Sequence, residues 1–314
     1  MKRLYPTLSV VLAGLGPILF FGWLAGGFTL GEISETRSLS MLEQSAQVFA
    51  GLMVKPLYSL LCLGLIVLLW GQRRRDVASL RWGLIAFWTG ETFCAVNFFV
   101  FQHESLLSEY LHSYGMALAF GLTVFAALEA LDVRLLKRNQ PEERCAFRAL
   151  CGPCKRNTPQ GCTVHNGLLL SLAFAAILTF IPLTAPLLPH AYNTSIYGFP
   201  YSYTRFALYE WYENRALPLL ALICFALALL ALLRSKEPLP LWAKIFFSAG
   251  LGALGFSLLR LALASIFREA LIWFEFWEEM TELMYIVGAG LVVWQFKHLL
   301  EKTRLMQWLM EEIR

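Results

Sequence analysis

Charged residues are scarce in this sequence, and no long polar segment interrupts its apolar ones. Only 15% of the 314 residues are Asp, Glu, Lys or Arg, whereas 58% are hydrophobic. A soluble globular domain carries about 25% charged residues. The longest polar interval, residues 133–165, is too short to bury a core of its own without a metal or disulfides. The composition therefore excludes a water-soluble domain within the chain.

The motifs on which soluble-type enzymes depend are also missing. The sequence contains no phosphate-cradling glycine loop, no nucleotide fingerprint and no pattern typical of a nucleophilic triad. What it has instead is a series of long apolar runs, each followed by a charged or turn-rich break. Since about 20 apolar residues in a helix cross a hydrocarbon core of about 30 Å, each run predicts a membrane-spanning helix. The eight runs are roughly residues 7–30, 50–70, 82–101, 112–132, 166–188, 215–233, 241–266 and 280–300.

The basic residues predict how these helices are oriented. Twenty of the 26 Lys and Arg fall near the two ends of the chain or in the 71–81, 133–165 and 234–244 intervals, which lie on one side of an eight-span topology. Because loops rich in Lys and Arg stay inside, we expect both termini in the cytoplasm. The net charge of +4 then averages a basic inner face with an acidic outer one, so it indicates contact with lipid headgroups and no nucleic acid.

The predicted fold is thus an all-α integral membrane protein with about eight transmembrane helices, in a membrane such as the bacterial inner membrane. Eight spans with both ends inside allow two parallel four-helix repeats, a first half at 1–132 and a second half at 166–300. A cytoplasmic cysteine-rich loop, 133–165, joins them. An amphipathic cytoplasmic tail, 301–314, is expected to lie along the inner leaflet.

Four cysteines in the 133–165 loop give the clearest chemical signal. They follow the spacing Cys-x5-Cys-x2-Cys-x7-Cys, at Cys145, Cys151, Cys154 and Cys162. On a reducing face they do not predict disulfides. Four thiolates can hold a tetrahedral zinc ion or an iron–sulfur cluster, and the spacing does not distinguish the two. A redox dithiol made of Cys151 and Cys154, or thiols without a ligand, are the alternatives.

A second cluster of candidate ligands lies at the outer end of the last span. Four glutamates recur there at i, i+3, i+4 and i+7, which places them on one helical face: Glu275, Glu278, Glu279 and Glu282. Like charges at this spacing repel unless they are solvated, partly protonated or shared with a cation. Glu109 and His112 form a Glu-x-x-His step of the kind found in di-iron bundles, although only one such step is present.

Other interpretations of these outer residues stay open. His103, Glu104 and His190 are expected at a similar depth, and all of these acids and histidines can simply meet water at the ends of the spans. A divalent-metal or proton-linked site is the functional alternative. Histidine pairs can also ligate haem, either His112 with His190 outside or His165 with His298 inside.

Three polar residues are expected within the hydrocarbon. Glu91 lies near the middle of the third predicted span, with Asn97 almost two turns further out, and Arg260 lies on the seventh. A buried carboxylate is costly and faces a cavity, a partner or a proton path. We therefore predict a Glu91–Arg260 pair, either structural or involved in transport.

These features favour a membrane-embedded redox or metal-binding protein. It would carry a four-cysteine centre inside and an acidic site at the outer rim, and a membrane or cytoplasmic redox partner would exchange electrons with it. The alternatives are a secondary transporter or ion permease that uses Glu91, Arg260 and the glutamates of the last span, and a sensor or assembly subunit whose tail contacts a partner.

Overall fold

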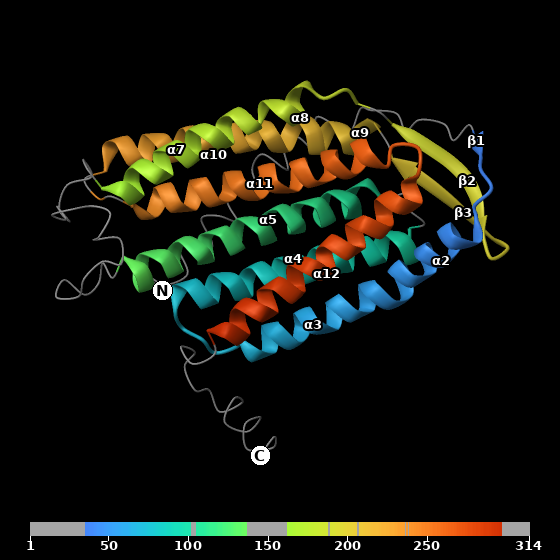
Figure 1. The fold of residues 1–314 in the computed structure, drawn as a ribbon, viewed down its shortest axis with the longest axis horizontal. Coiled ribbons are helices and arrows are strands. Elements are labelled where there is room, and N and C mark those ends of the chain that lie inside the picture. Colours follow the sequence, from blue (N-terminus) through green and yellow to red (C-terminus); the bar gives the residue numbers. More distant parts are fainter. Residues whose placement is uncertain are drawn as a thin grey trace, which may run out of the picture.

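The computed structural model describes residues 35–101, 105–136, 162–187, 189–205, 207–235, 237 and 239–296 (Figure 1). Long helices run side by side along the length of the molecule, and a small β-sheet covers one end of them. The first predicted span, most of the cysteine-rich loop and the tail lie outside the described residues. The sheet end corresponds to the predicted outer side, because α2 starts there and each following long helix reverses direction.

Five helical stretches in the described residues are long and apolar enough to cross a membrane, by length and composition. The mainly helical structure is therefore consistent with an all-α membrane protein. Two further long helices, α4 (Arg75–Phe99) and α12 (Leu271–Gln295), carry charged residues along their length. Eight spans and cytoplasmic termini stay predictions. The five stretches are Met41–Leu68, Leu106–Arg134, Thr163–Thr184, Leu208–Arg234 and Leu241–Ile266.

Two of these stretches contain a π-helical turn directly before a proline. In the first, α2 (Met41–Phe49) passes through η1 (Ala50–Val54) into α3 (Lys55–Leu68), with Pro56 in the first turn of α3. Pro56 has no N–H to donate to the preceding turn, and the wider π turn accommodates its ring. In the same way α9 (Ala207–Trp211) and η3 (Tyr212–Ala216) precede α10 (Leu217–Arg234), which holds Pro218. Both π turns lie next to buried charged residues.

Glycines allow the central helices to approach closely. α4 and α5 (Leu106–Ala130) form an antiparallel pair, and a Cβ on Gly115 would lie 2.7 Å from the Cα of Gly90. α5 also packs against α11 (Leu241–Ile266), where a side chain on Gly252 would collide with the backbone of Ala117 and Gly121. The helix pairs therefore meet backbone to backbone, as in small-residue membrane packing.

The sheet corrects the all-α prediction for one segment. β2 (His190–Ile196) and β3 (Phe199–Arg205) form an antiparallel hairpin, and β1 (Glu35–Thr36) pairs in parallel with β2. The hairpin turn has positive φ at both central residues, Tyr197 (φ 50°) and Gly198 (φ 86°). This is the geometry of the two-residue turn that suits twisted strands. Cross-strand neighbours Tyr192 and Tyr203 are fully buried over the start of α12, so this tyrosine-rich segment builds a packed layer.

Helices from the two predicted halves pack against each other. α5 from the first half lies along α11 from the second, and α12 crosses over α2 and α3 (Figure 1). η2 (Leu131–Leu135) extends α5 at the end opposite the sheet, where α7 (Thr163–Leu178) begins and leads into the short α8 (Phe180–Thr184). The matching π turns of the second and sixth predicted spans favour a duplication, which stays a prediction.

Candidate cation-binding site

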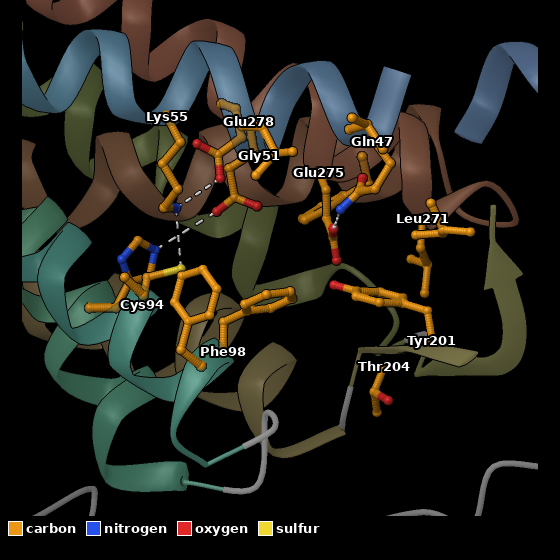
Figure 2. A pocket seen from close by; sticks show the side chains of 18 of the residues that line it. Gln47, Gly51, Lys55, Cys94, Phe98, Tyr201, Thr204, Leu271, Glu275 and Glu278 are labelled. Atoms are coloured by element: carbon orange, nitrogen blue, oxygen red, sulfur yellow. Dashed lines mark hydrogen bonds and ion pairs between the residues drawn. The ribbon is translucent and has the colours of Figure 1, made fainter. Parts of the chain in front are cut away.

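A cavity of about 480 Å³ lies at the sheet end of the helices. α2, η1, the last turns of α4, the hairpin and α12 supply most of its lining. In Figure 2, Tyr201 and Leu271 lie near the strands, Lys55 and Cys94 lie at the opposite side, and Glu275 lies between. The cavity therefore has an aromatic and aliphatic side and a strongly charged one.

The glutamates of α12 all line this cavity. Because they share one face of the helix, the face that packs inward carries all four. Glu275 accepts a hydrogen bond of 2.8 Å from the side-chain amide of Gln47 on α2. Glu282 is only 4% exposed, and its Oε2 atom has no hydrogen-bond partner. These carboxylates face the protein interior, so the interpretation of a water-facing stripe does not describe them.

Glu91 is paired with Lys55, and the predicted pair with Arg260 is wrong. The Nζ atom of Lys55 lies 2.8 Å from Glu91 Oε2 and 2.8 Å from Glu279 Oε1. The hydroxyl of Tyr58 also contacts both carboxylates, at 2.5 Å and 2.6 Å. Lys55 and Tyr58 lie three residues apart on α3, immediately after the π turn, so one helical face supplies a cation and a donor to two acids.

Arg260 instead belongs to a neighbouring chain of ion pairs. Its Nε atom lies 2.7 Å from Glu213 Oε1, and its guanidinium also contacts Glu278. Glu213, in η3, binds Arg205 at 3.0 Å through its second oxygen, and Arg205 binds Glu210 at 2.8 Å. These ion pairs bring the end of β3, η3, α11 and α12 together.

His112 lies between the two groups of ion pairs. Its Nδ1 atom is 3.4 Å from Glu91 Oε1, and its Nε2 atom is 3.9 Å from Glu278 Oε1. One ligand atom from each of Glu91, His112 and Glu282 lies within 4.8 Å of the others, and all three residues are buried. Oε1 of Glu91, like Oε2 of Glu282, has no hydrogen-bond partner in the part of the chain that the structure describes. Three helices, α4, α5 and α12, thus present ligand-type atoms to one point.

The residues that the sequence predicted as metal ligands have different neighbours in the structure from those expected. Glu109 lines the same cavity as His112 and accepts a hydrogen bond of 3.4 Å from the side-chain amide of Asn97, and a metal pair made of Glu109 and His112 stays a prediction. His190 starts β2 and packs against Tyr192. His103, Glu104, His298, Cys145, Cys151 and Cys154 lie outside the described residues. Cys162 is described, as the half-buried residue directly before α7.

The region around the cavity contains more acids than bases. Among the residues that the structure describes, eight carboxyl groups share it with three permanent cations and one histidine. Carboxylates without a counter-charge are costly in a low-dielectric interior, so they must be protonated or hold a cation. The acids are Glu91, Glu109, Glu210, Glu213, Glu275, Glu278, Glu279 and Glu282, and the bases are Lys55, Arg205, Arg260 and His112.

Tyr201 adds a protonated hydroxyl group at the sheet side of the cavity. Burial, together with the nearby Glu275 carboxylate, raises the pKa of Tyr201 well above its ordinary value. Its phenol therefore keeps its proton at neutral pH and can act only as a protonated hydroxyl there. The phenyl ring of Phe98 lies 6.0 Å away, centroid to centroid, which continues the aromatic wall.

The sequence analysis did not single out Lys55, Arg205 or Cys94 as residues of the site. In the structure Lys55 lies 3.4 Å from the sulfur of Cys94. Lys55 is the only charged residue in the apolar run 50–70, and this isolation is the signal that could have identified it. Glu213 had no comparable signal, because it stands among other polar and aromatic residues just outside an apolar run.

A second polar cluster lies at the other end of the helices. Lys244 on α11 binds Glu129 and, at 2.9 Å, Asp132. Asp76, at the start of α4, lies 3.0 Å from Arg134 and 3.1 Å from Arg74. The positive and negative charges of this cluster balance each other within these contacts. We therefore interpret the cluster as structural, because it connects the helix ends.

Comparisons of the chain with protein-family models, curated proteins and solved structures found no match. What the site does is therefore inferred from its own geometry.

Proposed function

We propose that this is a multi-pass membrane protein whose functional centre is a divalent-metal site formed by Glu91, His112 and Glu282. The observation that carries this proposal is the convergence of three buried ligand atoms within 4.8 Å of one another. Two carboxylate oxygens in the same group have no hydrogen-bond partner. A bound cation would satisfy both oxygens and offset the local excess of acid.

The spacing of two of the ligand atoms fits metal coordination. Two ligands bound at about 2.0–2.2 Å in a tetrahedral arrangement are separated by about 3.4 Å. His112 Nδ1 and Glu91 Oε1 are 3.4 Å apart. The other oxygen of Glu91 binds Lys55 and Tyr58, which fixes the orientation of the carboxylate and leaves Oε1 available. The Nε2 side of the imidazole faces the carboxylate of Glu278. In many metal sites the ring nitrogen that does not bind the metal faces a carboxylate in this way.

The ligand types favour a first-row ion. Two carboxylates and an imidazole suit zinc, iron or manganese, whereas magnesium and calcium prefer oxygen alone. Three protein ligands leave a coordination position for water or another small ligand, as in catalytic zinc sites. The adjoining cavity gives such a ligand room.

We further propose that Cys145, Cys151, Cys154 and Cys162 hold a zinc ion or an iron–sulfur cluster at the opposite end of the helices. Support for this second centre comes from the cysteine spacing, and from the position of Cys162 at the start of α7 away from the sheet. An iron–sulfur cluster there would make the protein a redox component with an electron-transfer partner.

A secondary transporter or ion permease is the second candidate function. The surplus of carboxylates around the cavity favours it, because protons exchanging with another cation at buried glutamates are a known means of coupling. A carrier would move the bound ion across a liposome membrane, whereas a metal centre with a fixed role would retain it.

Metal analysis in a variant that lacks the four loop cysteines tests the proposal. With Cys145, Cys151, Cys154 and Cys162 changed to Ser, any remaining zinc reports the site of Glu91, His112 and Glu282 alone. We expect about one zinc per chain after equilibrium dialysis, and loss of most of it on Glu282→Gln or His112→Gln. Glu275→Gln is the matched control, since it changes a glutamate of the same helix face outside the ligand group.

Undiminished zinc in both ligand variants would contradict the proposed site. Because a misfolded variant also loses metal, each variant must show the thermal transition of the parent protein in the presence of a chelator. A liposome flux assay on the parent protein then separates a carrier from a metal centre that keeps its ion.

A further inference from the structure

We infer that the cavity beside the metal site binds an amphipathic organic cation, an amine or quaternary ammonium attached to an apolar or aromatic body. This inference goes beyond the metal site and rests on a different part of the cavity. It starts from Glu275, which lies seven residues, or about 10 Å along the helix, from Glu282.

Glu275 has no ion-pair partner among the described residues. Its contact is the neutral amide of Gln47, and the nearby cations are engaged elsewhere. Lys55 binds Glu91 and Glu279, Arg260 binds Glu213 and Glu278, and Arg205 binds Glu210 and Glu213. A metal at Glu91, His112 and Glu282 would leave Glu275 without a counter-charge.

The size of the cavity is a second observation, separate from the charge of Glu275. The cavity also extends to Glu282, which is 4% exposed and whose Oε2 atom, without a hydrogen-bond partner among the described residues, would be satisfied by the proposed metal. The empty space, about 480 Å³, is within the range of small-molecule sites, which begins at about 300 Å³. Space of this size next to uncompensated acid can hold a whole organic ion.

The walls select a ligand with an apolar body. Aromatic rings and aliphatic chains line the same cavity as Glu275: Leu52, Phe98, Phe99, Phe199, Tyr201 and Phe274. The faces of aromatic rings attract ammonium groups, and a carboxylate among such rings is a standard arrangement for recognising an organic cation. Of these rings, Phe274 stacks on Arg205 and Arg260 at the charged side of the cavity.

The residues at the mouth of the cavity indicate that the ligand enters from an apolar environment. Phe99 and Phe199 are each 75% exposed and Leu52 is 69% exposed, although all three also line the cavity. The cavity therefore reaches the surface between η1, the end of α4 and the hairpin turn. An amphipathic molecule dissolved in the outer leaflet would meet this apolar rim first and the acid afterwards.

Binding of a matched pair of probes tests the inference. Phenylbutyl-trimethylammonium and its neutral analogue, in which carbon replaces the nitrogen, have the same shape and differ in charge. The full-length protein is held in nanodiscs with a metal chelator present, so the metal site does not contribute, and protein-free nanodiscs give the partition background. We expect saturable binding of the cation at least about tenfold tighter than binding of the neutral analogue.

Two variants make the result specific. Glu275→Gln should weaken binding of the cation about tenfold and leave the neutral analogue unchanged, because it removes charge and keeps volume. Phe98→Ala should weaken both probes, since it removes part of the wall. Glu269→Gln, an exposed glutamate outside the cavity, is the matched control and should change neither.

Equal binding of the two probes by the parent protein would overturn the inference, and so would a Glu275→Gln variant with undiminished affinity for the cation. Both readouts are independent of zinc. Failure of the proposed organic-cation site is therefore distinguishable from failure of the metal site. The metal site is measured by metal content in the variant that lacks the four loop cysteines.

Discussion

The ammonium of Lys55 lies 2.8 Å from Glu91, and this ion pair joins α3 to α4 in a region where Glu91 is only 3% exposed. Replacing Lys55 by Met should therefore cost about 3–5 kcal/mol of unfolding free energy, because Glu91 and Glu279 would lose their shared cation. Adding Glu91→Gln to that variant should recover part of the loss. Reversible denaturation in mixed micelles measures both. A Lys55→Met variant as stable as the parent would show that the pair does not contribute.

Glu91 should couple more strongly to Lys55 than to Arg260. The structure places Lys55 in direct contact with Glu91, whereas Arg260 contacts Glu213 and Glu278. Two double-mutant cycles, with Glu91→Gln combined with Lys55→Met or with Arg260→Leu, give the two interaction energies. We expect the Lys55 cycle to give the larger one, above about 1 kcal/mol. A larger value for Arg260 would contradict the arrangement described here.

Close packing of α5 on α11 depends on Gly252. Because an added methyl group would collide with the backbone of Ala117 and Gly121, Gly252→Ala should destabilise the protein by about 1–3 kcal/mol or more. Gly255→Ala, one turn further along the same helix, meets nothing within 4 Å. This control should be neutral or slightly stabilising, since Ala favours helix by about 1 kcal/mol over Gly. Similar losses in both variants would show that the close contact at Gly252 is not the cause of its effect.

Stability at the sheet end should fall at high pH. Burial raises the pKa of Tyr192 to about 12, and the pKa of Tyr203 is raised further by the same cause. In the unfolded chain these phenols ionise near their ordinary value of about 10. The folded protein therefore binds more protons above that value, and its stability decreases as pH rises from about 10 to 12. Changing both residues to Phe should flatten this decrease. An unchanged slope in the double variant would assign it to other groups.

Apolar periodicity was sufficient to place the helices. All seven predicted runs that fall in the described residues, beginning with 50–70, coincide with helix over most of their length, because a long apolar run has few other ways to satisfy its backbone. The hairpin was not predicted, because it lies between the apolar runs 166–188 and 215–233 and the prediction rested on those runs. The ion-pair partners of buried residues were harder to predict. The sequence indicates how deep in the membrane Glu91 and Arg260 lie, but the rotation of each helix about its axis decides which side chains meet.

The four glutamates of α12 are a second example in which the sequence predicts positions but not contacts. Spacing predicts that Glu275 and Glu282 share a face. It does not show that this face turns toward Lys55 and His112, which are supplied by helices far away in the chain. The outer metal set predicted from the sequence therefore includes His112 and Glu282, but it misses the role of Glu91 as their neighbour.

Anomalous X-ray scattering at the zinc absorption edge tests the central claim most directly. Crystals of the protein with its four loop cysteines changed to Ser, soaked in zinc, should show one strong anomalous peak between Glu91, His112 and Glu282. The ion should lie about 2.0–2.2 Å from one atom of each side chain. A fully occupied zinc elsewhere, with Glu91 Oε1 and Glu282 Oε2 bound only by protein or water, would contradict a metal site at this position.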